Sequence, residues 1–204
     1  TTICYRLNGK NTYALEGSIF IAGAGVQWLR DKVKLINNAY ETEKIAKSKK
    51  NNDGVYIVPA FSGMGAPYWK PDARGLITGL TRNSDWKSLV RAVVESVAYQ
   101  SYDLFDAMKK DGLKPKVIKV DGGMVANNWF TQEFSNVLGV QVTRPKITET
   151  TSLGSAYLAG LSADVFDNFS SLKKNWSIDK EFVPQKTTNG YLNWKRAVNK
   201  VLTN

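Results

Sequence analysis

The first residues of the chain alternate between apolar and polar, and helical spacing replaces that alternation further on. Ile3, Tyr5 and Leu7 alternate with polar neighbours, and Asn8-Gly9 supplies a turn. This pattern predicts a β-hairpin over the first 20 residues. Later, apolar residues recur at steps of three and four, which is typical of amphipathic helices. Such helices are expected over about 21–35, 85–111 and 190–202.

Shorter segments fill the stretches between these helices. Apolar runs bounded by turn residues predict strands over 55–58, 75–80, 117–121 and 140–144. Further helices are expected over about 41–50, 127–138 and 152–161, with short helical pieces and a loop from there to Pro184. Because strands come first and then alternate with helices, the order predicts an α/β fold with a mixed sheet. With no internal repeat or linker, residues 1–204 are expected to form a single domain.

The amino-acid composition excludes several kinds of catalytic and metal-binding site. The chain has 204 residues, of which 43% are hydrophobic and 23% charged, as in ordinary globular proteins. It has no histidine, which excludes a Ser-His-Asp triad, a Cys-His pair or a His-ligated metal within this chain. The single cysteine, Cys4, excludes a disulfide framework and suits a reducing compartment. With no secretory pattern and no apolar run long enough to span a membrane, a cytoplasmic protein is expected.

The net charge is +10 and the isoelectric point about 9.6. The densest basic stretch contains Lys44, Lys47, Lys49 and Lys50. We interpret it as the solvated end of a helix, because no helix-turn-helix, zinc finger or stacking motif accompanies it. No nucleic-acid partner is expected, although contact with another polyanion stays open.

The strand predicted over 117–121 and the turn that follows it are the most informative segment for function. The strand over 117–121 ends in Gly122-Gly123, and a helix is expected to begin at Asn127 or Asn128. Ligands of open α/β sheets bind beyond the carboxyl ends of strands. A double glycine there lets a flat ligand approach the backbone, and a helix N-terminus offers free N–H groups. Nucleotide binding is one interpretation, and a tight strand-to-helix turn is the other.

Two further segments are candidates. Glycines at 23 and 25 precede Gln27 on the first helix, which favours either a surface for a flat ligand or close packing of two helices. The loop over 61–75 carries three glycines, two prolines and the aromatic residues Tyr68 and Trp69. It is either a packed structural lid or a contact with a neighbouring domain or pocket.

Five runs together resemble the C-terminal domain of the glycerol kinases, in the FGGY family of carbohydrate kinases. The runs are ALEG at 14–17, AGAGVQWLRD at 22–31, GMGAPYW at 63–69, VDGGMVANN at 120–128 and LGSAYLAG at 153–160. They follow the family's order over nearly the whole chain. One departure is Ser88, where the family signature usually has His, Asn, Gln, Asp or Glu. Serine suits a helix start, so activity is not placed in doubt.

The resemblance implies an actin-like ATPase domain with a ribonuclease-H-like core, a mixed sheet with helices on both faces, beside a deep interdomain cleft. It implies binding of ATP or ADP, with Gly23 and Gln27 bordering the nucleotide and Gly123 and Asn127 on the adenine side. The catalytic base, the glycerol pocket and the phosphate loops belong to the family's N-terminal domain, so no catalytic residue is expected within residues 1–204. Mg²⁺ would be held mainly by the nucleotide phosphates and that other domain, and the whole enzyme would be a homo-oligomer.

The expected function is therefore the nucleotide-binding half of an ATP-dependent glycerol kinase, inactive alone. Two alternatives stay open. The chain could come from another sugar kinase of the family, or it could be a stand-alone binding domain without kinase activity, with its positive charge directed at a polyanion.

Overall fold

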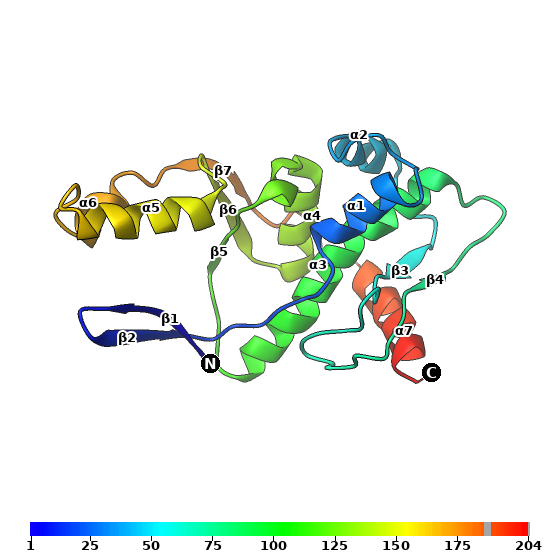
Figure 1. Cartoon of the computed structure of the whole chain (residues 1–204). Coiled ribbons are helices and arrows are strands. Elements are labelled where there is room, and N and C mark those ends of the chain that lie inside the picture. The colour runs from blue at the N-terminus through cyan, green and yellow to red at the C-terminus, as the bar shows by residue number, and fades with distance from the viewer. Residues whose placement is uncertain (186–188, 204) are drawn as a thin grey trace.

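The computed structural model describes residues 1–185 and 189–203, in which helices surround several small sheets (Figure 1). The helices are α1 (Gly23–Asp31), α2 (Glu41–Ser48), α3 (Trp86–Lys110), α4 (Asn128–Leu138), α5 (Thr150–Ser162), α6 (Phe169–Lys173) and α7 (Gly190–Leu202), with a 3₁₀ helix η1 (Gly123–Ala126) before α4. The strands are β1 (Thr2–Leu7), β2 (Lys10–Ala14), β3 (Tyr56–Val58), β4 (Leu76–Thr78), β5 (Val117–Lys119), β6 (Gln141–Pro145) and β7 (Ile178–Phe182).

The strands pair in a way that confirms the expected mixed sheet. β5 and β6 run parallel, and β7 joins the other edge of β6 antiparallel. β1 pairs with β2, and β3 with β4, each as an antiparallel hairpin-like pair. The turn between β1 and β2 places Asn8 at φ 48° and Gly9 at φ 78°, the left-handed pair that a tight hairpin needs.

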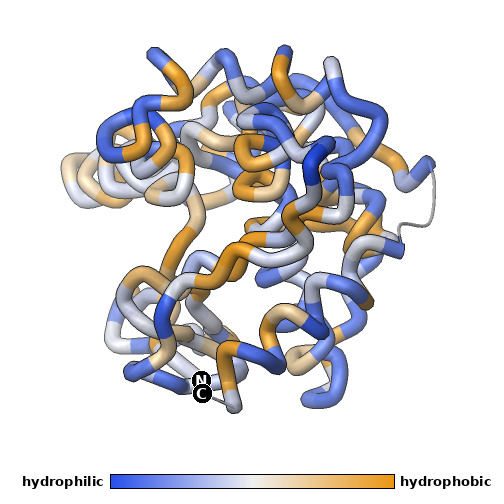
Figure 2. The backbone as a smooth tube through the Cα atoms, turned by 90° about the vertical axis from the view of Figure 1, so that its right-hand side faces the viewer, coloured by the Kyte–Doolittle hydropathy of each residue, from blue (hydrophilic) through white to orange (hydrophobic). Residues whose placement is uncertain are grey.

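The long helix α3 is the centre of the core. Val93 of α3 and Trp194 of α7 are fully buried, in one apolar cluster with Leu29 of α1, Ile45 of α2 and Phe130 of α4. Burying side chains of this size stabilises the fold by about 1.5–3 kcal/mol each. In Figure 2, hydrophobic stretches run through the middle of the molecule and hydrophilic ones predominate along the periphery.

Ser88, the departure from the family signature, caps α3. The Asp85 carboxylate accepts a hydrogen bond of 2.9 Å from the Ser88 amide, and the Ser88 hydroxyl accepts one of 3.4 Å from the Asp85 amide. This reciprocal pair is a capping box, and Ser88 is fully buried in it. Its hydroxyl also bonds Asp53 at 2.5 Å. The serine at this position is therefore explained by its role in capping α3.

A buried ion pair holds α2 on α3. Arg91 Nε donates to Glu95 Oε1 at 2.7 Å, and Arg91 Nη1 donates to the Ala46 carbonyl at 3.0 Å. Asn52 Nδ2 donates to the other oxygen of Glu95 at 2.9 Å. Burial raises the pKa of Glu95, and the neighbouring Arg91 opposes that shift. These hydrogen bonds fix the position of α2 relative to α3.

Two elements differ from their expected form. Helix α1 ends at Asp31 and not near residue 35, because Lys34 adopts φ 62° and the Leu35 amide bonds the Leu29 carbonyl at 3.0 Å. This left-handed ending leaves Val33 38% exposed instead of on the buried face. β7 lies where short helical pieces and a loop were expected. Its charged interior residues hide the strand pattern, and the strand forms by pairing with β6.

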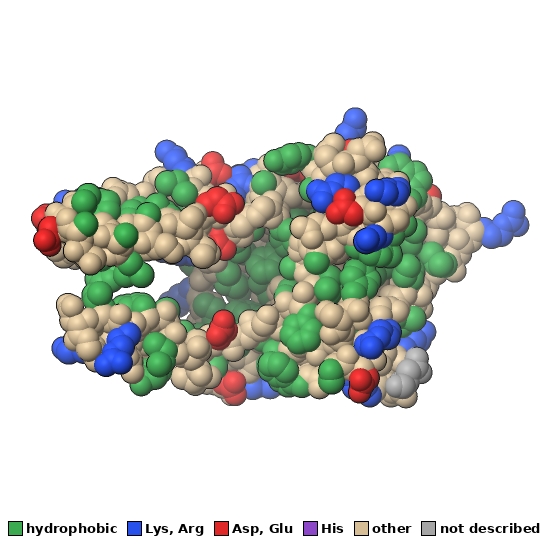
Figure 3. Space-filling model, in the orientation of Figure 1, with side chains coloured by type: hydrophobic (Ala, Val, Ile, Leu, Met, Phe, Trp, Pro, Cys, Tyr) green, Lys and Arg blue, Asp and Glu red, His purple; other side chains and the backbone are tan. Residues whose placement is uncertain are grey.

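One side of the molecule is open. The β1–β2 hairpin exposes Ile3, Tyr5 and Tyr13, and no residue of α5 is buried. Figure 3 shows the two arms, α5–α6 above and the hairpin below, projecting on either side of a gap with hydrophobic side chains on its walls. Across it, the Tyr5 and Phe169 rings have centroids 6.0 Å apart.

Candidate functional site

The fold brings the two glycine-rich segments together. Gly23 begins α1, and a Cβ atom built on it would lie 3.8 Å from Cγ of Met124 in η1. These segments are far apart in the sequence, and neither pattern alone predicts the contact. The structure therefore places Gly23 beside the Gly122-Gly123 turn, as a common surface requires.

The two glycines of that turn have different requirements. Gly122 adopts φ 84°, and its amide donates to the Thr148 carbonyl at 2.9 Å. A side chain at Gly122 would be strained for conformational reasons. Gly123 begins η1 without a positive φ, and a Cβ atom built on it meets nothing within 4 Å. Gly123 is thus dispensable for the fold, and its missing side chain leaves open space in front of the turn.

Gln27 lies one turn along α1 from Gly23, so the two share a face of the helix. Its side chain is exposed, whereas Val26 and Gly25 beside it are buried. Gly25 packs against α3, where an added Cβ would lie 3.0 Å from Cγ1 of Val93. The sequence left open ligand contact or helix packing for this segment. Gly25 serves packing, while Gly23 and Gln27 stay on the outer face.

Asn127 is the N-cap of α4. Its Oδ1 accepts from the Phe130 amide at 2.8 Å, and its Nδ2 donates to the Thr42 hydroxyl at 3.2 Å. Thr42 lies at the start of α2 and is only 3% exposed. The expected cap is confirmed, and Asn127 is held rigidly beside the turn. Thr42 was not anticipated, because nothing in its own segment signals a contact with α4.

Glu43 of α2 adds an electrostatic contact at the same place. Its Oε2 accepts from the Asn128 amide, the first of α4, at 3.3 Å, and its Oε1 accepts from Lys47 at 2.5 Å. Partial burial raises the pKa of Glu43, but Lys47 and the Asn128 amide outweigh it and the pKa lies below its ordinary value. Glu43 is thus ionised at neutral pH and stabilises the positive end of α4.

The turn is supported from the sheet side by Arg144 of β6. Its Nη1 donates to the Val125 carbonyl at 2.6 Å, and its Nη2 donates to Asn128 Oδ1 at 3.2 Å. Its Nε donates to Asp179 of β7 at 2.8 Å. The sequence placed Arg144 in a strand without assigning it a role. Its contacts join residues from four elements, which no local pattern reveals.

The loop over 61–75 is packed against the core at its base, in agreement with the lid interpretation. Its Tyr68 hydroxyl donates to the buried Asp103 at 2.5 Å, and Gly65 lies so close to Ser18 that an added Cβ would be 2.7 Å from the Ser18 carbonyl oxygen. Trp69, by contrast, is 68% exposed. The loop is thus a packed lid at its base that presents one aromatic ring to solvent.

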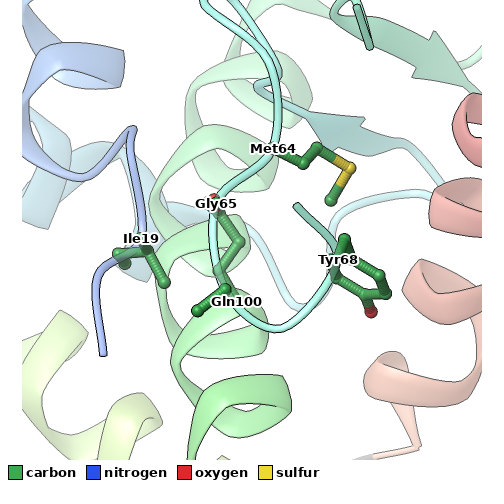
Figure 4. A pocket seen from close by; sticks show the side chains of 6 residues that line it. Ile19, Met64, Gly65, Tyr68 and Gln100 are labelled. Carbon is green, nitrogen blue, oxygen red and sulfur yellow. The ribbon is translucent and has the colours of Figure 1, made fainter. Parts of the chain in front are cut away.

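The surface is hollowed elsewhere, away from the predicted site residues. A cavity of about 10 Å³ lies under the loop, between Ile19, Met64, Tyr68 and Gln100 (Figure 4). That is room for one water at most. An open groove of about 440 Å³ runs between Tyr102 and Lys109 of α3 and the end of α4. Gly23, Gln27, Gly123 and Asn127 line neither.

Within residues 1–185 and 189–203, no group of three or more His, Cys, Asp or Glu side chains is placed to hold a metal ion. Over the same residues, no helix has the length and apolar character needed to cross a membrane.

Comparison with known proteins identifies the family. Residues 4–163 match the profile of the C-terminal domain of the FGGY family of carbohydrate kinases. Glycerol kinase from Alteromonas mediterranea is 53% identical over 98% of this chain, and glycerol kinase 1 from Pseudomonas aeruginosa is 49% identical over 98%. This chain spans 42% of the length of each of these two relatives.

Solved structures agree with the sequence match. The crystal structure of Plasmodium falciparum glycerol kinase with ADP superposes with a TM-score of 0.86 at 39% identity, over 98% of this chain and 41% of that one. A ligand-bound xylulose kinase from Lactobacillus acidophilus gives a TM-score of 0.72 at 22% identity, over 92% of this chain and 38% of its own, which bears on the fold alone. These likenesses confirm the actin-like ATPase fold expected from the resemblance. The chain belongs to the FGGY family of carbohydrate kinases and corresponds to its C-terminal domain.

Proposed function

We propose that this chain is the nucleotide-binding part of an ATP-dependent glycerol kinase, which converts glycerol and ATP to glycerol 3-phosphate and ADP. The observation that carries the proposal is its identity of about half with several glycerol kinases over nearly its whole length. Identity to the sugar kinases of known structure is much lower, at 22% for the xylulose kinase. That difference favours glycerol over a sugar as the substrate.

We propose that ATP or ADP binds on the surface formed by Gly23, Gln27, Gly123 and Asn127. Support comes from the contact between Gly23 and Met124 and from the open space before Gly123. A flat nucleobase could approach both backbones there, because no Cβ stands in the way. The exposed side-chain amide of Gln27 supplies a polar group at its rim. The ADP named for the Plasmodium kinase is consistent with this choice of ligand.

We propose that the remaining three fifths of the kinase supply the catalytic groups and the glycerol-binding groups that this surface lacks. The catalytic base, the glycerol pocket, the phosphate loops and most Mg²⁺ contacts would lie there, and residues 1–204 would act as one domain. The apolar walls of the gap between α5 and the hairpin support this division, because exposed patches of this kind usually mark a missing partner. The whole enzyme would be a cytoplasmic homo-oligomer. The chain alone should show essentially none of the turnover of about 1–100 per second typical of kinases.

The test of the site is a graded substitution of Gly123. Because Gly123 has space for a Cβ and does not need a positive φ, Gly123→Ala and Gly123→Val should leave the unfolding midpoint nearly unchanged. A steric effect on the ligand should grow with side-chain size, so the dissociation constant for ADP should rise with alanine and rise further with valine. Gly122→Ala is the control for backbone strain, since it should lower stability. If Gly123→Val binds ADP as well as the unchanged chain does, the proposed site is wrong.

A further inference from the structure

A short 3₁₀ helix beside the proposed nucleotide surface has carbonyl groups that it cannot satisfy itself. η1 has four residues, so the carbonyls at its end lack partners within the helix. Val125, whose side chain is buried, has its carbonyl bonded by two side chains, Arg144 at 2.6 Å and Thr131 at 3.1 Å. The turn is thus held by donors from outside its own segment.

Arg144 makes contacts on both sides of the junction between η1 and α4. Besides Val125, its Nη1 approaches the Ala126 carbonyl at 3.5 Å, and its Nη2 reaches the Asn128 side chain at 3.2 Å. A planar guanidinium can make such contacts at once, whereas a lysine ammonium is a single point charge. The geometry therefore uses the shape of arginine as well as its charge.

The charge of Arg144 is balanced away from the turn. Asp179 lies 2.6 Å from Nη2 of Arg144, and the Arg144 side chain is 12% exposed while that of Asp179 is 43% exposed. The guanidinium also lies over the Phe182 ring, 5.6 Å from its centroid. Arg144 thus contacts β7 on one side and the η1–α4 junction on the other.

The opposite side of the turn is empty. Nothing lies within 4 Å of a Cβ built on Gly122 or Gly123. Arg144 acts on the turn through Val125, whose carbonyl it bonds and whose amide donates to the Gly122 carbonyl at 3.3 Å. We propose that Arg144 is a positioning residue for nucleotide binding, which holds the Gly122-Gly123 turn at the height where its open side can contact the base. This inference rests on the proposed function, because it assigns a role within the same site.

The test compares four variants by their dissociation constants for ADP and by the amide shifts of Gly122 and Gly123 in the free protein. Arg144→Met removes every donor and should weaken ADP binding on the order of tenfold, the factor that corresponds to one hydrogen bond. It should also move both glycine amide shifts before any ADP is added. Arg144→Lys, which can restore one contact, should recover part of the affinity and also keeps the test available if the methionine variant fails to fold.

Two controls separate positioning from general stability. Asp179→Asn loses the ion pair but keeps the donors to the turn, and Lys180→Met removes a neighbouring cation over the same Phe182 ring. Both should bind ADP within about threefold of the unchanged chain. Wild-type affinity in Arg144→Met, or equal weakening in Asp179→Asn, would overturn the inference. Failure of the unchanged chain to bind ADP would instead contradict the proposed function and, with it, this inference.

Discussion

Helices α5 and α7 have the same length, 13 residues, yet they differ completely in burial. α7 buries Trp194, Ala197, Val198 and Val201, although it also carries three basic residues. α5 has no charged residue and buries none of its side chains. The more apolar helix is thus the exposed one. Apolar character shows that a helix needs a partner, but it does not show that the partner lies in the same stretch of chain.

The same contrast divides the whole molecule. Around α3 the helices and the β3–β4 pair share one core, whereas the β1–β2 hairpin and α5 project from it on either side of a gap. In the proposed enzyme, the rest of the polypeptide would cover these apolar walls. The packed half should therefore govern the stability of this chain, and the open half should contribute little. The following substitutions test that difference.

The largest effect is expected from matched truncations in the two helices. Trp194 is fully buried, and its Nε1 donates to the Ile57 carbonyl at 3.1 Å. Trp194→Ala should lower the free energy of unfolding by about 3–5 kcal/mol. Leu158 of α5 is 46% exposed, so Leu158→Ala should cost no more than about 0.5 kcal/mol. Denaturant unfolding measures both. Similar losses for the two would mean that α5 is packed in solution.

A smaller effect is expected where α3 holds the loop and α7 together. Asp103 accepts hydrogen bonds from the hydroxyls of Tyr68 and Tyr191, at 2.5 Å each, and from Lys195 at 2.9 Å. Burial, and next the Asp103 carboxylate, raise the pKa of both tyrosines, so both hydroxyls stay protonated and donate. Asp103→Asn should cost about 1.5–3 kcal/mol.

The matched control for Asp103 is Asp106→Asn, on the same helix. Asp106 pairs with the exposed Lys110, and its side chain is 43% exposed. Its loss should be within about 0.5 kcal/mol. Thermal unfolding of the two variants side by side gives the comparison. An equal loss would show that the Asp103 network contributes no more than a surface pair.

The smallest effect is expected at Glu43, and it should depend on pH. The pKa of Glu43 in the folded chain lies below its ordinary value of 4.5. The stabilisation is therefore present above about pH 4.5 and is lost as the pH falls through the lower, folded value. Glu43→Gln should cost about 1 kcal/mol at pH 7, and the difference should shrink as the pH falls below about 4.5. A difference that does not shrink on acidification would contradict the assigned contact with α4.

Elements that are determined by their own residues were predicted correctly from the sequence. The bounds of α7 agree with its apolar spacing, and Asn127 was recognised as a possible helix start from residue type alone. Helix α1 came out shorter, because the left-handed Lys34 has no signature in an apolar pattern. β7 was missed because a strand whose interior is charged becomes a strand only when it pairs with β6.

In the candidate site, too, some residues were predicted from the sequence and others were found only in the structure. The glycines at 23 and 123 could be singled out from their motifs, but the contact between their segments depends on the fold. Arg144 and Thr42 were missed because their partners lie on other elements. Sequence patterns thus indicated the residues that leave space for a ligand, and the structure was needed to find those that hold them in place.

We expect the nucleotide to bind the surface formed by Gly23, Gln27, Gly123 and Asn127, and not the open half with α5 and the hairpin. The most direct measurement is a map of backbone and side-chain amide shifts of this chain during titration with ADP. The largest saturable changes are expected at Gly23 and Gly123 and in the side-chain amides of Gln27 and Asn127, with α5 and the hairpin unchanged. Saturable shifts confined to α5 and the hairpin, or none at Gly23 and Gly123, would contradict this expectation.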